Sequence, residues 1–339
     1  MTDNQTSPQE YVLHNANQGR LDVVLSAALS ESRNQVERLI ANGHVMIDGK
    51  VAQKGGMKLV GGEELRVWIP KPIQASAGEY EVDFDVEVLF EDDSLLVLNK
   101  PPRVVVHSAP SVREATLVEW LRNRGTPLSN INGEERWGIV HRLDKETSGA
   151  IVVAKNNETH VALSRQLQDK SMGRYYLALI DCPLKENRLV ECALGRSPAN
   201  RLKIAKITHG RYAKSAFVKL CESADRSCEL IAAKLFTGRT HQIRAHLELL
   251  GRHILNDSLY GYAKEPFSRV FLHAYLLYLR HPMTLETMFF KAPLFEDMLG
   301  YLERNFPTEL LDEGLSPDSI VERFDVFDER VRNGGVWGS

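Results

Sequence analysis

His141-Arg142-Leu143-Asp144-Lys145-Glu146-Thr147-Ser148-Gly149 is a charged stretch that immediately precedes the apolar run at residues 150–154. It should form a loop held by a buried strand, and loops on rigid elements often carry functional side chains. Asp144 is flanked by Arg142 and Lys145, which would favour an ionised, nucleophilic carboxylate if both side chains point toward it. Without further information, an aspartate beside an arginine in a loop is more often a surface ion pair.

The surrounding pattern favours an α+β fold. Short apolar runs such as residues 95–98 and 176–180 mix irregularly with amphipathic stretches such as residues 116–122 and 240–250. The regular strand-helix-strand alternation of a doubly wound parallel sheet is missing. A mixed α+β domain is therefore expected around the charged loop.

A smaller module precedes this domain. Residues 21–28 carry the apolar stripe of an amphipathic helix, and Ser32 with Gln35 forms a capping box that starts a second helix. Gly43 is placed to end that helix in the left-handed conformation. Asp48-Gly49 is a strong hairpin signal. The sequence thus predicts a compact helix-helix-hairpin module.

These patterns divide the chain into four expected segments. They are a polar leader at 1–18, the small module at 19–75, the α+β domain at 82–305 and an acidic tail at 306–339.

Composition narrows the class of protein. The 339 residues are 43% apolar and 26% charged with a net charge of −3, as in an ordinary globular protein. No apolar run is long enough to span a membrane and the first residues do not resemble a signal peptide, so we expect a cytoplasmic protein without a membrane partner. The four cysteines form no C-x-x-C pair, and His241 and His246 are five residues apart rather than four, so no metal site is expected.

Basic residues gather in two places despite the negative net charge. Arg33, Arg38 and Lys50 lie around the second helix and the hairpin of the small module, and Arg196, Arg201 and Lys203 begin a run to residue 219 that contains no acid. Both groups could hold RNA phosphates. Solvated charged faces are the alternative interpretation.

The small module resembles a known RNA-binding domain. R-L-D-x-x-L from Arg20, S-R-x-x-V-x-x-L-I-x-x-G-x-V-x-I-D-G-K from Ser32 and G-G-E-E-L-R-V ending at Val67 are similar to the domain shared by small-subunit ribosomal protein four and several RNA-modifying enzymes. The resemblance implies binding to structured RNA.

The charged loop resembles the signature of RluA-type pseudouridine synthases, and three further stretches match the same family in order. They are Asn99-Lys100-Pro101-Pro102 through His107, Arg174-Tyr175-Tyr176-Leu177-Ala178, and Gly238-Arg239-Thr240-His241-Gln242-Ile243-Arg244-Ala245-His246 followed by Asp257 and Tyr260-Gly261. Arg103 and Asn256 stand where the family commonly has glycine, which questions the local backbone geometry. The resemblance covers about residues 84–298 and implies a mixed, largely antiparallel sheet with flanking helices.

The resemblance also implies a mechanism in which uridine is isomerised to pseudouridine without a cofactor. Asp144 is the implied nucleophile, Arg244 its charge partner, and Tyr176 the residue that packs against the base and is a candidate proton acceptor. Arg142 is implied to fill the space left by the flipped-out base. The expected partner is RNA, bound by a monomer.

Large-subunit (23S) ribosomal RNA is the expected substrate, and transfer RNA is the alternative. Two other classes remain as rivals, a non-catalytic ribosome-assembly factor and a metal-dependent RNA hydrolase. The intact set of Asp144, Tyr176 and Arg244 argues against the first, and the missing cluster of carboxylate ligands argues against the second.

Overall fold

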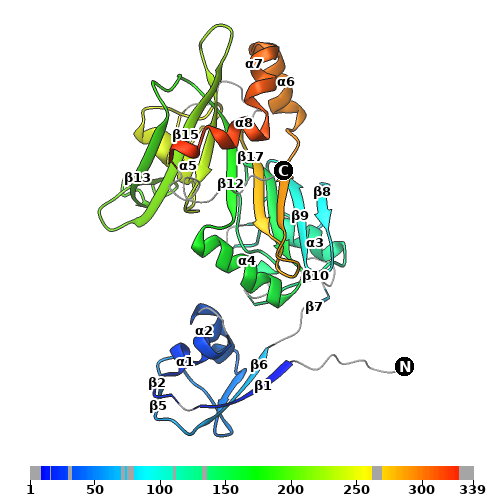
Figure 1. Cartoon of the computed structure of the whole chain (residues 1–339), viewed down its shortest axis with the longest axis vertical. Helices are drawn as coiled ribbons and strands as arrows, with labels where there is room; N and C mark the ends of the chain where they lie inside the picture. The colour runs from blue at the N-terminus through cyan, green and yellow to red at the C-terminus, as the bar shows by residue number, and fades with distance from the viewer. Residues whose placement is uncertain are drawn as a thin grey trace.

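The computed structural model describes residues 9–15, 17–29, 33–69, 73–74, 80–109, 112–131, 136–261 and 269–327, without the side chains of residues 9, 34, 35, 38, 73, 74 and 326. Figure 1 shows two bodies: a small N-terminal one and a larger one built on a long sheet. The α+β prediction is confirmed.

The small body consists of two helices beside a four-stranded sheet of order β1-β6-β3-β4. Its elements are β1 (Gln9–His14), β2 (Gly19–Arg20), α1 (Leu21–Ala28), α2 (Arg33–Ala41), β3 (Val45–Ile47), β4 (Lys50–Val51), β5 (Lys58–Leu59) and β6 (Glu64–Ile69). Asp48 and Gly49 have φ values of 47° and 76°, as a tight hairpin turn between β3 and β4 requires, and Gly43 ends α2 at φ 75°. The predicted helices and hairpin are confirmed, whereas Ser32 and the side chain of Gln35 lie outside the described residues.

The segment expected as a polar leader contributes a strand. β1 pairs antiparallel with β6 along six residues. Tyr11 and Leu13 alternate with exposed residues and pack against the core of the small body. The three apolar residues at 11–13 form too short a run to stand out as a strand in the otherwise polar first segment.

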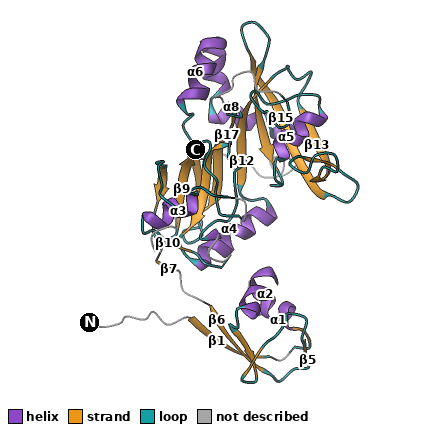
Figure 2. Cartoon of the chain, turned by 180° about the vertical axis from the view of Figure 1, so that it is seen from behind, coloured by secondary structure: helices purple, strands orange, loops and turns teal. Residues whose placement is uncertain are grey.

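The large body is built on a ten-stranded sheet of order β14-β13-β15-β16-β12-β17-β11-β9-β8, with β18 paired to β17. The strands are β8 (Glu87–Glu91), β9 (Leu95–Lys100), β11 (Ser148–Ala154), β12 (Gly173–Ile180), β13 (Arg188–Arg196), β14 (Ile204–Lys206), β15 (Arg211–Glu222), β16 (Glu229–Leu235), β17 (Leu272–Arg280) and β18 (Thr287–Lys291). A separate pair joins β10 (Pro127–Leu128) to β7 (Ile73–Gln74). Helices α3 (Leu117–Asn123), α4 (Asn157–Asp169) and α5 (Gln242–Leu249) lie around the sheet (Figure 2).

All strand pairs in this sheet are antiparallel except β11 with β17, so the expected mixed, largely antiparallel sheet is confirmed. The parallel contact is confined to Ser148 and Gly149, opposite His273 and Ala274. Gly149 has φ 112°, and a Cβ there would come within 2.3 Å of the Ala274 carbonyl oxygen. Only glycine allows this approach, which fixes the end of the charged loop against the centre of the sheet.

The segment after Phe306, expected as an acidic tail, is folded through residue 327. It follows α6 (Glu296–Asn305) and contains α7 (Thr308–Gly314), α8 (Pro317–Glu322) and the short helix η2 (Asp325–Phe327). Leu311, Ile320 and Phe324 are buried in the main core, and the Phe324 ring lies 5.3 Å from that of Tyr175. Apolar residues at helical spacing thus outweigh the acidic composition. No helix in the described ranges is long and apolar enough to cross a membrane.

Candidate active site

A cavity of about 340 Å³ lies where the charged loop, β12 and the start of α5 meet. Asp144, Tyr176 and Arg244 all line it, so the structure brings together the three residues that the motifs singled out. Five arginines line the same cavity: Arg136, Arg142, Arg174, Arg239 and Arg244. Asp144 is the only acidic residue among the described lining residues.

Hydrogen bonds from buried side chains hold the loop that carries Asp144 against the sheet. Lys100 donates hydrogen bonds to the carbonyl oxygens of Val104 and Lys145, at 2.9 and 3.2 Å. Ser148 Oγ lies 2.8 Å from His273 Nδ1, and His273 Nε2 lies 3.1 Å from the Ala292 carbonyl oxygen. These bonds tie the loop to strands on both sides, so the position of Asp144 is set by the rigid sheet.

Arg244 contacts two carboxylates. Its Nε and Nη2 donate to Asp257 at 2.7 and 2.8 Å, while Nη1 lies 3.7 Å from Asp144 Oδ2. Burial is the largest single influence and disfavours the charged guanidinium, yet the hydrogen bonds and charge of Asp257, with the charge of Asp144, outweigh it and raise the pKa of Arg244. The expected pairing of Arg244 with Asp144 is therefore the looser of its two ion pairs.

His241 is a second cavity residue close to Asp144. Its Nε2 lies 4.0 Å from Asp144 Oδ2 and its Nδ1 lies 3.2 Å from the Tyr260 hydroxyl. Burial lowers the pKa of His241, and Asp144 partly opposes that shift. The sequence placed His241 in a motif and argued only against a metal site with His246, because nothing in the spacing indicated that it lies near Asp144.

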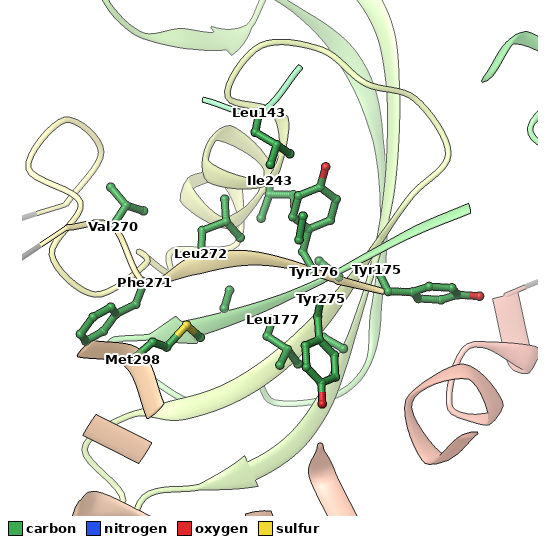
Figure 3. Close-up of a cluster of buried hydrophobic side chains, with 14 of the residues drawn as sticks. Leu143, Tyr175, Tyr176, Leu177, Ile243, Val270, Phe271, Leu272, Tyr275 and Met298 are labelled. Carbon is green, nitrogen blue, oxygen red and sulfur yellow. The ribbon is translucent and has the colours of Figure 1, made fainter. Parts of the chain in front are cut away.

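Tyr176 faces the cavity from the central strand β12. In Figure 3 its ring points toward Leu143 and Ile243, whereas Tyr275 projects to the opposite side of the sheet. Burial raises the pKa of Tyr176, with Arg174 opposing that shift and Asp144 adding to it, so the hydroxyl carries its proton at neutral pH. The ring offers a flat apolar surface beside the carboxylate.

The two cations that flank Asp144 in sequence do not contact it. Lys145 Nζ binds the Glu114 carboxylate at 2.7 and 2.9 Å, outside the cavity. Arg142 is exposed at the edge of the cavity, with Nη1 3.5 Å from His107 Nε2. The arginine that approaches Asp144 is instead Arg244 of α5, about a hundred residues further along the chain.

The basic run from Arg196 to Lys219 contains no acid in sequence, but acids from neighbouring elements partner several of its lysines. Lys203 Nζ lies 2.8 Å from Glu248, and Lys214 Nζ lies 2.8 Å from Glu191. Arg196 and Arg201 are exposed on the β13–β14 hairpin, where Arg196 Nη1 donates to the Arg201 carbonyl oxygen at 2.8 Å. Arg196 and Arg201 therefore remain solvent-exposed candidates for phosphate binding.

In the small body, Arg33 is exposed at the first position of α2 and Lys50 is exposed just after the hairpin turn. The side chain of Arg38 lies outside the described residues. Two predicted phosphate-binding residues are thus accessible on one module.

The two family departures keep a glycine-like backbone. Arg103 has φ 66° and Asn256 has φ 64°, both in the left-handed region where glycine is favoured. The geometry that the substitutions put in question is therefore retained. Asn tolerates this region better than Arg, so the strain falls mainly on position 103.

Gln242 holds the loop before α5 in place. Its Oε1 accepts from Thr237 Oγ1 and the Arg239 backbone N–H at 2.7 and 2.9 Å, and its Nε2 donates to Ser215 Oγ at 2.8 Å. Sequence reasoning noted this residue only as part of a motif, because its bond to Ser215 joins it to a strand that is distant in sequence.

Comparisons with known proteins agree with this arrangement. Residues 94–249 match the family described as RNA pseudouridylate synthase, and residues 19–65 match the S4 domain. These two matches define the protein as an RNA-modifying enzyme that carries its own RNA-binding module. A protein of Helicobacter pylori described as an uncharacterized RNA pseudouridine synthase is 51% identical over 315 residues, which are 90% of this chain and 95% of that protein. The chain belongs to the RNA pseudouridine synthase family, of the RluA type, and it is an isomerase that acts on RNA.

Two further similarities cover most of the chain. The ribosomal large subunit pseudouridine synthase D of Neisseria meningitidis is 36% identical over 297 residues, covering 84% of this chain and 78% of that protein. The solved structure of human RNA pseudouridylate synthase domain containing 1 superposes with a TM-score of 0.50 at 23% identity, over 68% of this chain and 99% of that one. This structural likeness supports the fold alone.

Proposed function

We propose that this enzyme converts specific uridines of large-subunit (23S) ribosomal RNA into pseudouridine, with Asp144 as the nucleophile. The observation that carries the proposal is the lone Asp144 carboxylate, held in an arginine-lined cavity with Tyr176 and Arg244. The choice of RNA rests on relatives named ribosomal large subunit pseudouridine synthase D, at 35% and 36% identity. A ribosomal substrate fits the expected cytoplasmic location.

The reaction moves the uracil from an N–C to a C–C link. An Asp144 oxygen bonds to C1′ of the ribose while the C1′–N1 bond breaks and its electron pair leaves with the uracil. The ring turns, C5 bonds to C1′, and the Asp144 oxygen departs with its electrons. C5 then loses a proton and N1 gains one, so the product is an isomer and no co-reactant is consumed.

The other cavity residues have separate proposed roles. Arg244 orients the Asp144 carboxylate, because it is itself held by Asp257. The buried Tyr176 ring packs against the flipped base. Its hydroxyl is the candidate acceptor for the C5 proton, and it releases its own hydroxyl proton as it accepts that one. A cavity of about 340 Å³ has the size expected of a small-molecule site, which suits one extruded nucleoside.

RNA binding is divided between the two bodies in this proposal. Arg33 and Lys50 bind the backbone of a structured RNA on the small module, with Arg38 as a further contact expected from the sequence, while Arg196 and Arg201 contact phosphates from the β13–β14 hairpin. Lys203 is a weaker candidate, because Glu248 already balances its charge. Arg142, exposed at the edge of the cavity, enters the stack that the flipped base leaves.

The test is to map pseudouridines in RNA from cells with and without this protein, and then to add purified enzyme to unmodified RNA. We expect one or a few sites in large-subunit ribosomal RNA to disappear with the protein and to reappear on addition. If pseudouridines disappear only from transfer RNA, then transfer RNA is the substrate and the proposal of ribosomal RNA is wrong. Loss of ribosome assembly with every pseudouridine retained would support a non-catalytic role instead.

A further inference from the structure

The cavity holds one buried cation that no acidic residue in the described part of the chain pairs with. Arg244 is paired with Asp257, and Arg136, Arg142 and Arg239 are exposed to solvent. Arg174 differs, because it is only 8% exposed. Its side chain forms no hydrogen bond or ion pair with any residue that the structure describes, and its Nε is buried without a partner.

Such a burial is costly unless something else compensates. Removing a charged group from water without a partner has a large free-energy cost, and buried polar groups in proteins are nearly always hydrogen-bonded. A neutral or apolar side chain would avoid this cost. An unpartnered guanidinium inside a substrate cavity therefore points to a partner that arrives with the substrate.

The position of Arg174 indicates which part of the substrate it meets. It lies two residues before Tyr176 on β12, on the same face of the strand, and both line the cavity. Its guanidinium rests against Gly238, where a Cβ would come within 2.9 Å of Nη1. Its charge reaches Tyr176, whose pKa it lowers against the stronger effect of burial. Arg174 is thus beside the ring on which the base is proposed to pack.

We propose that Arg174 is a catalytic residue that donates hydrogen bonds to a carbonyl oxygen of the flipped uracil and stabilises the negative charge of the departing base. This inference rests on the proposed function. When the C1′–N1 bond breaks, the electron pair that leaves with uracil spreads over N1, O2 and O4. When C5 rebonds to C1′ and the proton shifts from C5 to N1, the base becomes neutral and Arg174 loses its charged partner.

The alternative source of negative charge on the same nucleotide is its phosphate. Phosphates stay on the RNA backbone at the mouth of the cavity, where the exposed Arg136, Arg142 and Arg239 can meet them. Arg174 is largely buried beside Tyr176, and a hydrogen bond to developing charge contributes more in such a site than at the solvent-exposed mouth. The base is therefore the favoured partner.

The test compares Arg174→Met, which removes the charge at similar length, with Arg174→Lys, which retains a charge. Lys234→Met is the matched control, because Lys234 is a buried cation on the neighbouring strand whose Nζ lies 5.3 Å from the Tyr175 ring, outside the cavity. Each full-length variant is checked for its melting temperature and its RNA affinity. Base extrusion is followed with a fluorescent base beside the target uridine, and conversion is timed in single turnover at saturating enzyme.

We expect Arg174→Met to slow conversion by roughly 100- to 1,000-fold with RNA affinity and extrusion retained, as for loss of one donor to developing charge. Arg174→Lys should recover part of the rate, and Lys234→Met should convert at the wild-type rate. A normal conversion rate in Arg174→Met, or equal losses in both Met variants, would overturn the inference.

Modified substrates identify the contacted atom. If Arg174 contacts the base, a 2-thiouridine or 4-thiouridine at the target site should slow wild-type enzyme more than it slows Arg174→Met, because the variant has already lost that hydrogen bond. The contrary result is a methylphosphonate at the target nucleotide that slows the wild type more than Arg174→Met, while neither thio base does so. That result would show that Arg174 contacts the phosphate and would refute the proposal. Failure of the wild type to form pseudouridine in any RNA would instead refute the proposed function on which the inference rests.

Discussion

Arg244 and Asp257 form a bidentate ion pair, with Nε and Nη2 of the arginine 2.7 and 2.8 Å from the two carboxylate oxygens. Asp257 is fully buried and is not among the described residues that line the cavity. Its Oδ1 also accepts from the backbone N–H groups of Leu259 and Tyr260, each at 3.1 Å. The carboxylate thus fixes the guanidinium that reaches Asp144 at 3.7 Å.

Asp257→Asn should therefore slow catalysis, although the side chain at this position does not contact the substrate. The amide keeps the size of the side chain but cannot accept two charge-assisted bonds, so Arg244 loses its fixed orientation. We expect the single-turnover rate to fall by roughly 100-fold, the scale of a small misplacement of a catalytic group. Breaking a buried pair should also cost about 3–5 kcal/mol of unfolding free energy.

The matched control is Asp297→Asn. It breaks another bidentate pair, in which Arg269 binds Asp297 at 2.7 and 3.0 Å, away from the cavity. It should lower stability while leaving the rate of the folded enzyme unchanged. Equal rate losses in the two variants, measured well below both melting temperatures, would show that Asp257 acts only through stability.

Arg142→Ala should impair base extrusion rather than chemistry. Arg142 is exposed at the cavity edge and is not tied to Asp144, so its proposed task is to fill the stack after flipping. A fluorescent base beside the target uridine should show a suppressed change in Arg142→Ala and a normal change in Arg244→Ala.

An already mismatched target uridine should partly rescue Arg142→Ala and not Arg244→Ala, since a mismatch lowers only the cost of extrusion. Lys145→Ala serves as the control from the same loop, because its ammonium pairs with Glu114 outside the cavity. A normal fluorescence change in Arg142→Ala would assign the stack-filling role to another residue.

Arg33→Ala combined with Lys50→Ala should weaken RNA binding and make it less dependent on salt. Each phosphate contact contributes about 0.9 to the slope of log affinity against log salt, so the loss of two contacts should reduce the slope by about 2. Conversion at saturating enzyme should persist. Lys185→Ala, an exposed lysine on the large body, should change neither quantity. An unchanged slope in the double variant would exclude these residues as phosphate contacts.

Arg103→Gly should be more stable than Arg103→Ala by about 1 kcal/mol, because both remove the side chain and only alanine keeps the strain of a left-handed backbone. Denaturant unfolding of the two variants measures the difference. Equal stabilities would mean that the backbone at position 103 relaxes to a negative φ.

The sequence was most informative where a signal is local. Asp48-Gly49 and Gly43 need no distant partner to specify a turn and a helix end, and both have the expected positive φ. The motifs also predicted that Asp144, Tyr176 and Arg244 meet, since a family resemblance carries information about three-dimensional contacts. The fold class followed from the same two sources.

Relationships between distant segments could not be read in this way. The bond between Arg244 and Asp257 depends on the turn after α5, and the pairing of Lys203 with Glu248 depends on a hairpin folding over that helix. Arg174 looked like one more residue of a strand motif. Its missing partner becomes visible only when its burial and its neighbours are known.

Asp144→Asn, assayed in single turnover on the mapped target RNA, tests the central claim most directly. The amide is nearly isosteric but cannot supply an anionic nucleophile to C1′. We predict a folded protein that binds RNA as the wild type does and forms no pseudouridine. Full conversion by this variant, with reversion to aspartate by deamidation excluded by mass spectrometry, would contradict the assignment of Asp144 as nucleophile.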